Sequence, residues 1–255
     1  MKTLALINEI DDIKEILQKS LKFVKDDTLE VLFVHEEELF SISKILKAQF
    51  FKDEKLDKEA IKEKIKQTLK ELGYSKDAAI LVYVGDTLST IEDTQKDINP
   101  FIVTKYNKAT RALAKSSFRV LFLKTNCDNY KNIVINVTLN DNDSKLIEFA
   151  KENFPDANIK LVYDYIYIIT TDIAITDPLI GANLDVYLDE EVKDAYKKRF
   201  EELLKKYNLS GKFLEDLQNQ EELITYINSN NFDLAIFVDD NRDLIDDTKI
   251  DSIVF

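Results

Sequence analysis

Glycine is scarce in this sequence. The 255 residues include only Gly73, Gly85, Gly181 and Gly211, and no two of them lie closer than twelve positions. The usual share of glycine is about 7%. A phosphate loop of the G-x-x-x-x-G-K-[ST] type, or a G-x-G-x-x-G dinucleotide turn, needs several glycines within a few residues. The sequence therefore excludes both motifs, and any anion site must be built in another way.

Cysteine, histidine and long apolar runs are rare as well. The single Cys127 excludes an internal disulfide framework, and the single His35 leaves no histidine cluster for zinc. No apolar run approaches the roughly 20 residues that span a bilayer. Acidic residues interrupt the N-terminal MKTLALINEIDD, unlike a secretory signal peptide. We therefore expect a cytoplasmic protein with no membrane contact.

Positive charge is in deficit. Lys and Arg number 35 and Asp and Glu number 48, which gives a formal net charge of −13. A nucleic-acid-binding protein must neutralise phosphates with cations, so we expect no nucleic-acid partner. Hydrophobic residues make up 45% of the chain, enough to bury a core in one large domain or in two of about 125 residues.

Short β-branched runs alternate with helical patterns along the chain. The first half suggests strands at residues 4–7, 29–34, 79–84, 101–104 and 120–123 and helices at 10–24, 61–72, 87–96 and 108–115. The second half suggests strands at 133–137, 159–169, 212–214, 234–238 and 252–255 and helices at 145–154, 190–207 and 221–228. This alternation predicts an α/β fold of βαβ units with a parallel sheet. The almost wholly apolar run 79–84 is typical of a strand covered on both faces.

The two halves match each other in register. At an offset of 130, apolar positions coincide, as in Leu17 with Ile147 and Leu29 with Ile159; by the last strand the offset is 133, with Val120 matching Ile253. We interpret this as an internal repeat. It predicts domains at residues 1–125 and 132–255, joined by a short polar linker and packed as an intrachain pseudo-dimer. Further pairing into a homodimer stays open.

Several segments resemble the universal stress proteins, the UspA-like family. Tyr83–Thr87 (YVGDT) resembles the family's strand–Gly-Asp-Pro–helix junction, and Val31–His35 (VLFVH) resembles the end of its second strand. Residues 110–123 resemble its final helix and last strand, and residues 139–150 and 231–236 resemble its first loop and helix and its fourth strand. The resemblance implies two flavodoxin-like (Rossmann-like) units with strand order 3-2-1-4-5. It also implies a stress-response or regulatory role without catalysis.

The chain departs from this family at its nucleotide-binding residues. Nucleotide-binding members carry a loop resembling G-x-x-G-x(9)-G-[ST] after the fourth strand, whereas here Thr104–Ala109 (TKYNKA) and Asp239–Asp243 (DDNRD) contain no glycine. The family's aspartate after the first strand is replaced by Asn8 and by Thr138. A loop without glycine does not easily form a nest of N–H groups around phosphate. We therefore expect a degenerate second domain, no cofactor, and no ATP binding through the family loop.

A degenerate nucleotide site in the first half is the alternative. The resemblance would place the base of ATP or AMP near Asn8, Val34 and Gly85, and the phosphates near Thr104, Lys105 and Lys108. Ligands of doubly wound sheets bind beyond the carboxyl ends of the strands. The basic residues Lys105, Lys108, Arg111 and Lys115 could attract a small anionic ligand there, or form an ordinary solvated helix face.

The remaining clusters favour ordinary structural roles. The acidic segments 140–143 and 239–247 lack the turn glycine and terminal glutamate of a calcium loop, so we expect no metal site and solvated, helix-capping loops. The stripe Lys58, Lys62, Lys66 and Lys70 indicates a solvated helix exterior, with a partner-binding stripe as the alternative.

Two apolar connecting segments and two residues of potentially reactive types remain to be interpreted. Leu39–Phe51 and Ile173–Leu188 are expected to cover the pseudo-dimer seam, although the first could instead form a groove for an unidentified protein partner. His35 and Cys127 have no partners for nucleophilic catalysis. An α/β hydrolase would also need a nucleophile elbow, which is absent. We therefore expect that the protein is not an enzyme.

Overall fold

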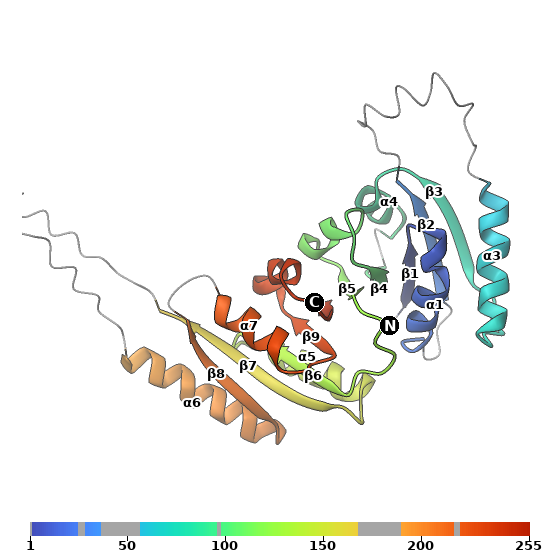
Figure 1. Cartoon of the computed structure of the whole chain (residues 1–255). Coiled ribbons are helices and arrows are strands. Elements are labelled where there is room, and N and C mark those ends of the chain that lie inside the picture. Colours follow the sequence, from blue (N-terminus) through green and yellow to red (C-terminus); the bar gives the residue numbers. More distant parts are fainter. Residues whose placement is uncertain (1, 25–28, 37–56, 96–97, 168–189, 217–219) are drawn as a thin grey trace, which may run out of the picture. The chain divides into compact units, whose positions relative to one another are not determined.

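A computed structural model describes residues 2–24, 29–36, 57–95, 98–167, 190–216 and 220–255 (Figure 1). The chain divides into two compact units. Unit 1 comprises Met1–Asn129 and Asp239–Phe255, and unit 2 comprises Tyr130–Val238. Within the described ranges, no helix is long and apolar enough to cross a membrane.

Unit 1 is built on a mostly parallel sheet. Its strands are β1 (Thr3–Ile7), β2 (Leu29–His35), β3 (Ala79–Val84), β4 (Phe101–Lys105), β5 (Arg119–Leu123) and β10 (Asp251–Val254), in the spatial order β3-β2-β1-β4-β5-β10. The first five are parallel and follow the predicted order 3-2-1-4-5. β10 joins this sheet antiparallel to β5, with Ile253 opposite Leu121.

Unit 2 has a four-stranded parallel sheet. Its strands are β6 (Asn132–Asn136), β7 (Asn158–Ile166), β8 (Ser210–Asp216) and β9 (Leu234–Phe237), in the order β9-β6-β7-β8. This corresponds to the positions 4-1-2-3 of the predicted unit. The fifth predicted strand of this half is β10, which pairs with β5 in unit 1.

The helices follow the predicted amphipathic patterns. Those of unit 1 are α1 (Ile13–Leu21), α3 (Lys58–Glu71) and α4 (Thr87–Thr94), with the 3₁₀ segments η1 (Ile10–Asp12), η2 (Arg111–Lys115) and η3 (Asp239–Asp246). Those of unit 2 are α5 (Asn142–Asn153), α6 (Glu190–Tyr207) and α7 (Glu221–Ser229).

Local sequence sets the ends of α3. The Asp57 carboxylate accepts from the Ala60 N–H at 3.0 Å, which caps its first turn. The last turn closes where Gly73 adopts a φ of +78°. The N–H groups of Gly73 and Tyr74 then donate to the carbonyls of Lys70 and Leu69, a Schellman ending that favours glycine.

The core of unit 1 lies around the central strands, whose side chains are buried on both faces. Every residue of β1 and β4 except Lys105 is buried, and Phe33, Phe101 and Phe122 are almost completely enclosed. The same burial was predicted for residues 79–84 and is wrong there. β3 is the edge strand of the sheet, so Tyr83 and Val84 are 38% and 39% exposed.

Two further predictions differ from the structure. The helix predicted at 108–115 is reduced to the 3₁₀ segment η2, because residues 106–110 form a turn instead. The predicted second domain extends to residue 255, whereas the segment 239–255 belongs to unit 1 through the pairing of β10 with β5. The division into two tandem domains stays a prediction.

Candidate functional site

The carboxyl ends of the unit 1 strands bring two predicted residues, Asn8 and Val34, together. The Asn8 side chain, directly after β1, donates from Nδ2 to the Val34 carbonyl at 2.9 Å and to Thr87 Oγ1 at 3.0 Å. It thereby connects the ends of β1 and β2 to the start of α4. Asn8 Oδ1 is enclosed and has no hydrogen-bond partner. Asn8 therefore acts first as a structural link, with one free acceptor.

Gly85 lies at the junction between β3 and α4. Its φ is +154°, a value that L side chains rarely adopt, and its N–H donates to the His35 carbonyl at 3.0 Å. The next residue, Asp86, caps α4 by accepting from the Ser89 N–H and hydroxyl, each at 2.8 Å. These hydrogen bonds lower the pKa of Asp86. The Gly-Asp pair thus turns the chain and starts the helix.

On the other side of β1, Thr104 and Lys105 end β4. Thr104 is fully buried, and Lys105 Nζ lies 2.7 Å from Glu15 Oε2 of α1. Burial raises the pKa of Asp12 nearby, and the charge of Lys105 opposes that rise. The positive charge predicted to attract an anion is therefore already compensated by carboxylates of η1 and α1.

The turn between β4 and η2, residues 106–110, uses its backbone N–H groups internally. Asn107 Oδ1 accepts from the N–H groups of Ala109 at 2.9 Å and Thr110 at 3.1 Å. The Thr110 hydroxyl in turn accepts from the Asn107 N–H at 3.0 Å. The N–H groups of Tyr106 and Arg111 donate to the carbonyls of Leu123 and Asn107, each at 2.9 Å. These five groups are no longer available to a phosphate.

Of the four basic residues predicted to gather here, Lys105 and Arg111 pair with carboxylates of the chain. Arg111 Nε donates to Asp246 Oδ2 of η3 at 2.9 Å, while Lys108 and Lys115 are exposed. The Tyr106 hydroxyl also donates to Asp246. Against the effect of burial, the hydrogen bonds from Arg111 and Tyr106 lower the pKa of Asp246. Arg111 therefore holds η3, whereas Lys105 is bound to α1.

η3 replaces the solvated loop predicted at residues 239–247. Leu244 and Ile245 are buried, and Asp246 accepts the hydrogen bonds described above. Lys124 at the end of β5 donates to the Ile245 carbonyl and to the Thr248 carbonyl at 2.7 Å. The prediction was wrong because it considered only local charge. The partners of this acidic segment lie more than 100 positions earlier in the chain.

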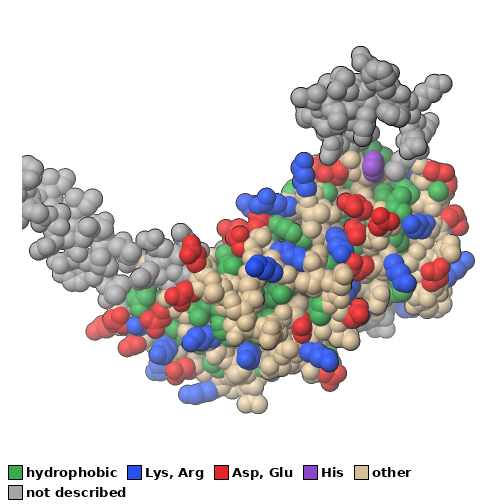
Figure 2. All heavy atoms as spheres, in the orientation of Figure 1, with side chains coloured by type: hydrophobic (Ala, Val, Ile, Leu, Met, Phe, Trp, Pro, Cys, Tyr) green, Lys and Arg blue, Asp and Glu red, His purple; other side chains and the backbone are tan. Residues whose placement is uncertain are grey.

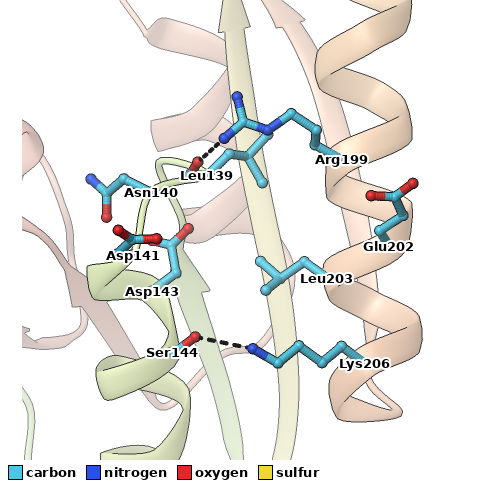
Figure 3. A pocket seen from close by; sticks show the side chains of 9 residues that line it. All are labelled: Leu139, Asn140, Asp141, Asp143, Ser144, Arg199, Glu202, Leu203 and Lys206. Carbon is cyan, nitrogen blue, oxygen red and sulfur yellow. Dashed lines mark hydrogen bonds between the residues drawn. The ribbon is translucent and has the colours of Figure 1, made fainter.

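Unit 2 contains a pocket of about 260 Å³ between the start of α5 and the side of α6 (Figure 3). It is lined by Leu139, Asn140, Asp141, Asp143, Ser144, Arg199, Glu202, Leu203 and Lys206. Asp143, predicted to belong to a solvated cluster, is only 1% exposed and accepts from the Thr138 N–H at 3.1 Å. Sequence reasoning missed this pocket because α6 is distant in sequence from α5.

The other predicted features occupy surface positions. On α3, Lys62 and Lys66 pair with Glu59 and Glu63, as expected for a solvated exterior. Figure 2 shows positive and negative side chains interspersed over one face of the molecule. Among the described residues, no group of three or more His, Cys, Asp or Glu side chains could hold a metal ion. The apolar connections 39–51 and 173–188 lie outside the described residues.

No family model and no curated protein matches the chain in sequence. Solved structures do match in fold. A functionally unknown protein, PA1789 from Pseudomonas aeruginosa PAO1, aligns with a TM-score of 0.63 and 14% identity, covering 100% of this chain and 92% of that one. A universal stress protein from Archaeoglobus fulgidus DSM 4304 aligns with a TM-score of 0.59 and 12% identity, covering 99% and 95%.

The cytoplasmic domain of a prokaryotic cation chloride cotransporter also aligns, with a TM-score of 0.51 and 11% identity, covering 99% of this chain and 94% of that domain. At these identities the similarity concerns the fold alone. The chain therefore has a mixed α/β fold of the universal stress protein type, with a mostly parallel sheet.

Proposed function

We propose that this chain is a non-catalytic regulatory protein of the universal stress type, acting in the cytoplasm through protein partners. It does not bind ATP through a phosphate loop, and it needs no cofactor. The observation that carries this proposal is the turn after β4, where Asn107 and Thr110 occupy the backbone N–H groups that a phosphate would need.

Phosphate binding by backbone requires several N–H groups that converge and remain unbonded. In residues 106–111, the groups of Tyr106, Asn107, Ala109, Thr110 and Arg111 donate within the protein. Freeing them would break the turn that joins β4 to η2. Side chains of the chain itself therefore accept from the backbone N–H groups at this strand end. This arrangement supports a regulator that does not bind phosphate there.

Charge supports the same proposal. Lys105 is paired with Glu15, and Arg111 with Asp246. A nucleotide phosphate would have to compete with carboxylates that are part of the chain and already in place. The high effective concentration of such intramolecular partners disfavours an external anion.

The pairing of β5 with β10 supports the tandem-repeat part of the proposal. Val120 lies opposite Val254, and Leu121 lies opposite Ile253. At the repeat offset of 133, Val120 corresponds to Ile253 and Leu121 to Val254. Each residue therefore pairs with the counterpart of its neighbour, as a local twofold axis between equivalent strands requires. This local symmetry supports the pseudo-dimer interpretation, which stays a proposal.

A nucleotide-binding protein with a degenerate site is the second candidate. It is favoured by the unpartnered Oδ1 of Asn8, whose amide contacts Val34 and Thr87, since an adenine amino group could donate to that oxygen. Lys108 is exposed and could reach a phosphate. In this case Asn8, Val34 and Gly85 would hold the base, with Thr104, Lys105 and Lys108 at the phosphates.

Thermal unfolding with millimolar ATP or AMP separates the two candidates. A regulator that does not bind nucleotide should shift by less than about 1 °C, whereas saturation at 100 times the Kd adds about 2.7 kcal/mol and a shift of several degrees. If a shift occurs, a chain carrying Lys105→Glu and Lys108→Glu should lose it. The matched charge reversal Lys58→Glu and Lys62→Glu on α3 should retain it. A shift of several degrees that follows this pattern overturns the proposal in favour of the degenerate site.

A further inference from the structure

Asp143, the second residue of α5, is a buried carboxyl with one unused oxygen. The residue is 1% exposed. Its Oδ1 accepts from the N–H of Thr138 at 3.1 Å and from the Thr138 hydroxyl at 3.4 Å, while Oδ2 has no hydrogen-bond partner. An enclosed carboxylate oxygen without a donor is costly, by roughly 1–3 kcal/mol or more. A donor supplied by a ligand would remove that cost.

The pocket that Asp143 lines lies between two helices of unit 2. Figure 3 shows Arg199 reaching from α6 to the Leu139 carbonyl at one end of the pocket, and Lys206 reaching Ser144 at the other. The two distances are 2.6 Å and 3.4 Å. Arg199 and Lys206 are both exposed side chains, so each can rearrange around a guest.

The pocket presents both kinds of charge. Asp143 requires a donor, whereas Arg199 and Lys206 supply further donors beyond the single hydrogen bonds drawn in Figure 3. Lys206 also lies near the N-terminal turn of α5, where the helix dipole favours a negative group. A guest that fits must carry a cationic donor and an anionic acceptor a short distance apart.

We propose that this pocket binds a small zwitterion of the α-amino acid class. Its ammonium group donates to Asp143 Oδ2, and its carboxylate is held by Lys206 at the start of α5. Arg199 keeps its hydrogen bond to the Leu139 carbonyl at the other end of the pocket. A cavity of about 260 Å³ holds a molecule of this size.

Other ligand classes fit less well. A metal ion would need three or more acidic or other ligating groups close together, and the described residues contain no such group. A simple anion such as phosphate would leave Asp143 Oδ2 without a donor and would be repelled by it. A simple amine would offer no acceptor to Lys206, which would keep only its 3.4 Å hydrogen bond to Ser144.

The site is independent of the proposed function. Its residues belong to unit 2, whereas the residues that decide nucleotide binding belong to unit 1. A negative result with ATP therefore says nothing about this pocket, and a negative result with amino acids says nothing about the turn at Asn107.

The test titrates the full chain with each standard α-amino acid and follows backbone amide signals by NMR. Ethylamine and acetate serve as probes of the two halves of a zwitterion. We expect at least one amino acid to shift the amide signals of Ser144 and Leu203 with a Kd below about 10 mM. Ethylamine and acetate should bind at least about tenfold more weakly.

Variants locate the binding. Lys206→Ala changes an exposed side chain and should weaken binding at least about tenfold, whereas the neighbouring Lys205→Ala should leave it unchanged. Asp143→Asn should abolish binding, because the amide presents a donor to the ammonium group; circular dichroism checks that this variant folds. Binding should also weaken as the Asp143 carboxylate is protonated at acid pH. The proposal is overturned if no amino acid binds at about 10 mM, or if Lys206→Ala and Lys205→Ala bind equally well.

Discussion

At the scale of single residues, the most unusual group is Lys124 at the end of β5. Its ammonium group donates to the carbonyls of Ile245 and Thr248 and lies 4.3 Å from the centre of the Tyr106 ring. Burial lowers the pKa of Lys124 to about 8, although three aspartates nearby act in the opposite direction. The Lys124 ammonium group thus connects the end of β5 to residues 245–248, and its burial costs desolvation free energy.

This lowered pKa predicts an unusual pH dependence. Between pH 8 and 10.5 the unfolded chain binds the Lys124 proton more tightly than the folded chain, so stability should rise with pH in this window. Tyr106 has the opposite effect above pH 10. Burial raises the pKa of Tyr106 to about 12, so the stability that its neutral phenol contributes is lost as the pH rises from 10 to 12.

Urea unfolding measured between pH 7.5 and 10 checks this prediction. The free energy of unfolding of the natural chain should increase relative to Lys124→Met by about 1 kcal/mol, after allowance for solvent screening. Lys115→Met, at an exposed lysine of η2, should have the same dependence of unfolding free energy on pH as the natural chain. Parallel pH profiles for the natural chain and Lys124→Met would contradict the assigned pKa.

Residue roles at the site were only partly predictable from sequence. The junction of Gly85 and Asp86 could be placed because turn glycines and capping aspartates act on their neighbours. The link from Asn8 to Thr87 could not, because it joins residues 79 positions apart. The pocket beside Asp143 was missed for a similar reason, since the α6 residues that line it lie some fifty residues later in the chain.

At the scale of elements, periodicity predicted the helices and strands well. α3 and α6 have the spacing of amphipathic helices, and the buried runs in β1, β4 and β5 read as strands on local pattern alone. The exposure of β3 was not predictable in this way, because an edge position is set by which strands pair. η2 is shorter than predicted because residues 106–110 form a turn before it, in which Asn107 Oδ1 accepts from the N–H groups of Ala109 and Thr110.

The element that most depends on long-range contacts is β10. Asp251 is completely buried, and its Oδ1 accepts from the N–H groups of Lys124 at 2.8 Å and Thr125 at 2.7 Å. It also accepts from the Thr125 hydroxyl at 3.0 Å. These hydrogen bonds fix the start of β10 against the end of β5.

Asp251→Ala should therefore loosen the pairing of β10 with β5. Two backbone N–H groups would lose their acceptor, with an expected loss of about 2–4 kcal/mol in the free energy of unfolding. Hydrogen–deuterium exchange should show faster exchange in residues 119–123 and 251–254. Asp243→Ala, at an exposed position of η3, is the matched control. Unchanged exchange in both strands would show that Asp251 does not hold them together.

At the scale of the whole molecule, the chain combines a universal-stress-type fold with a turn after β4 whose backbone N–H groups are bonded by its own side chains. The fold similarity spans nearly the full length of the solved structures compared, at identities of 11–14%. The residues after β4 differ from a phosphate loop in sequence and in hydrogen bonding. The proposed regulatory role rests on this difference.

The most direct test of this account is native mass spectrometry of the purified full chain after incubation with ATP and magnesium. The account predicts only the mass of the chain itself, 29.6 kDa, with no bound nucleotide. A stoichiometric ATP adduct that survives buffer exchange, and that disappears when Lys105 and Lys108 are replaced by Glu, would contradict it.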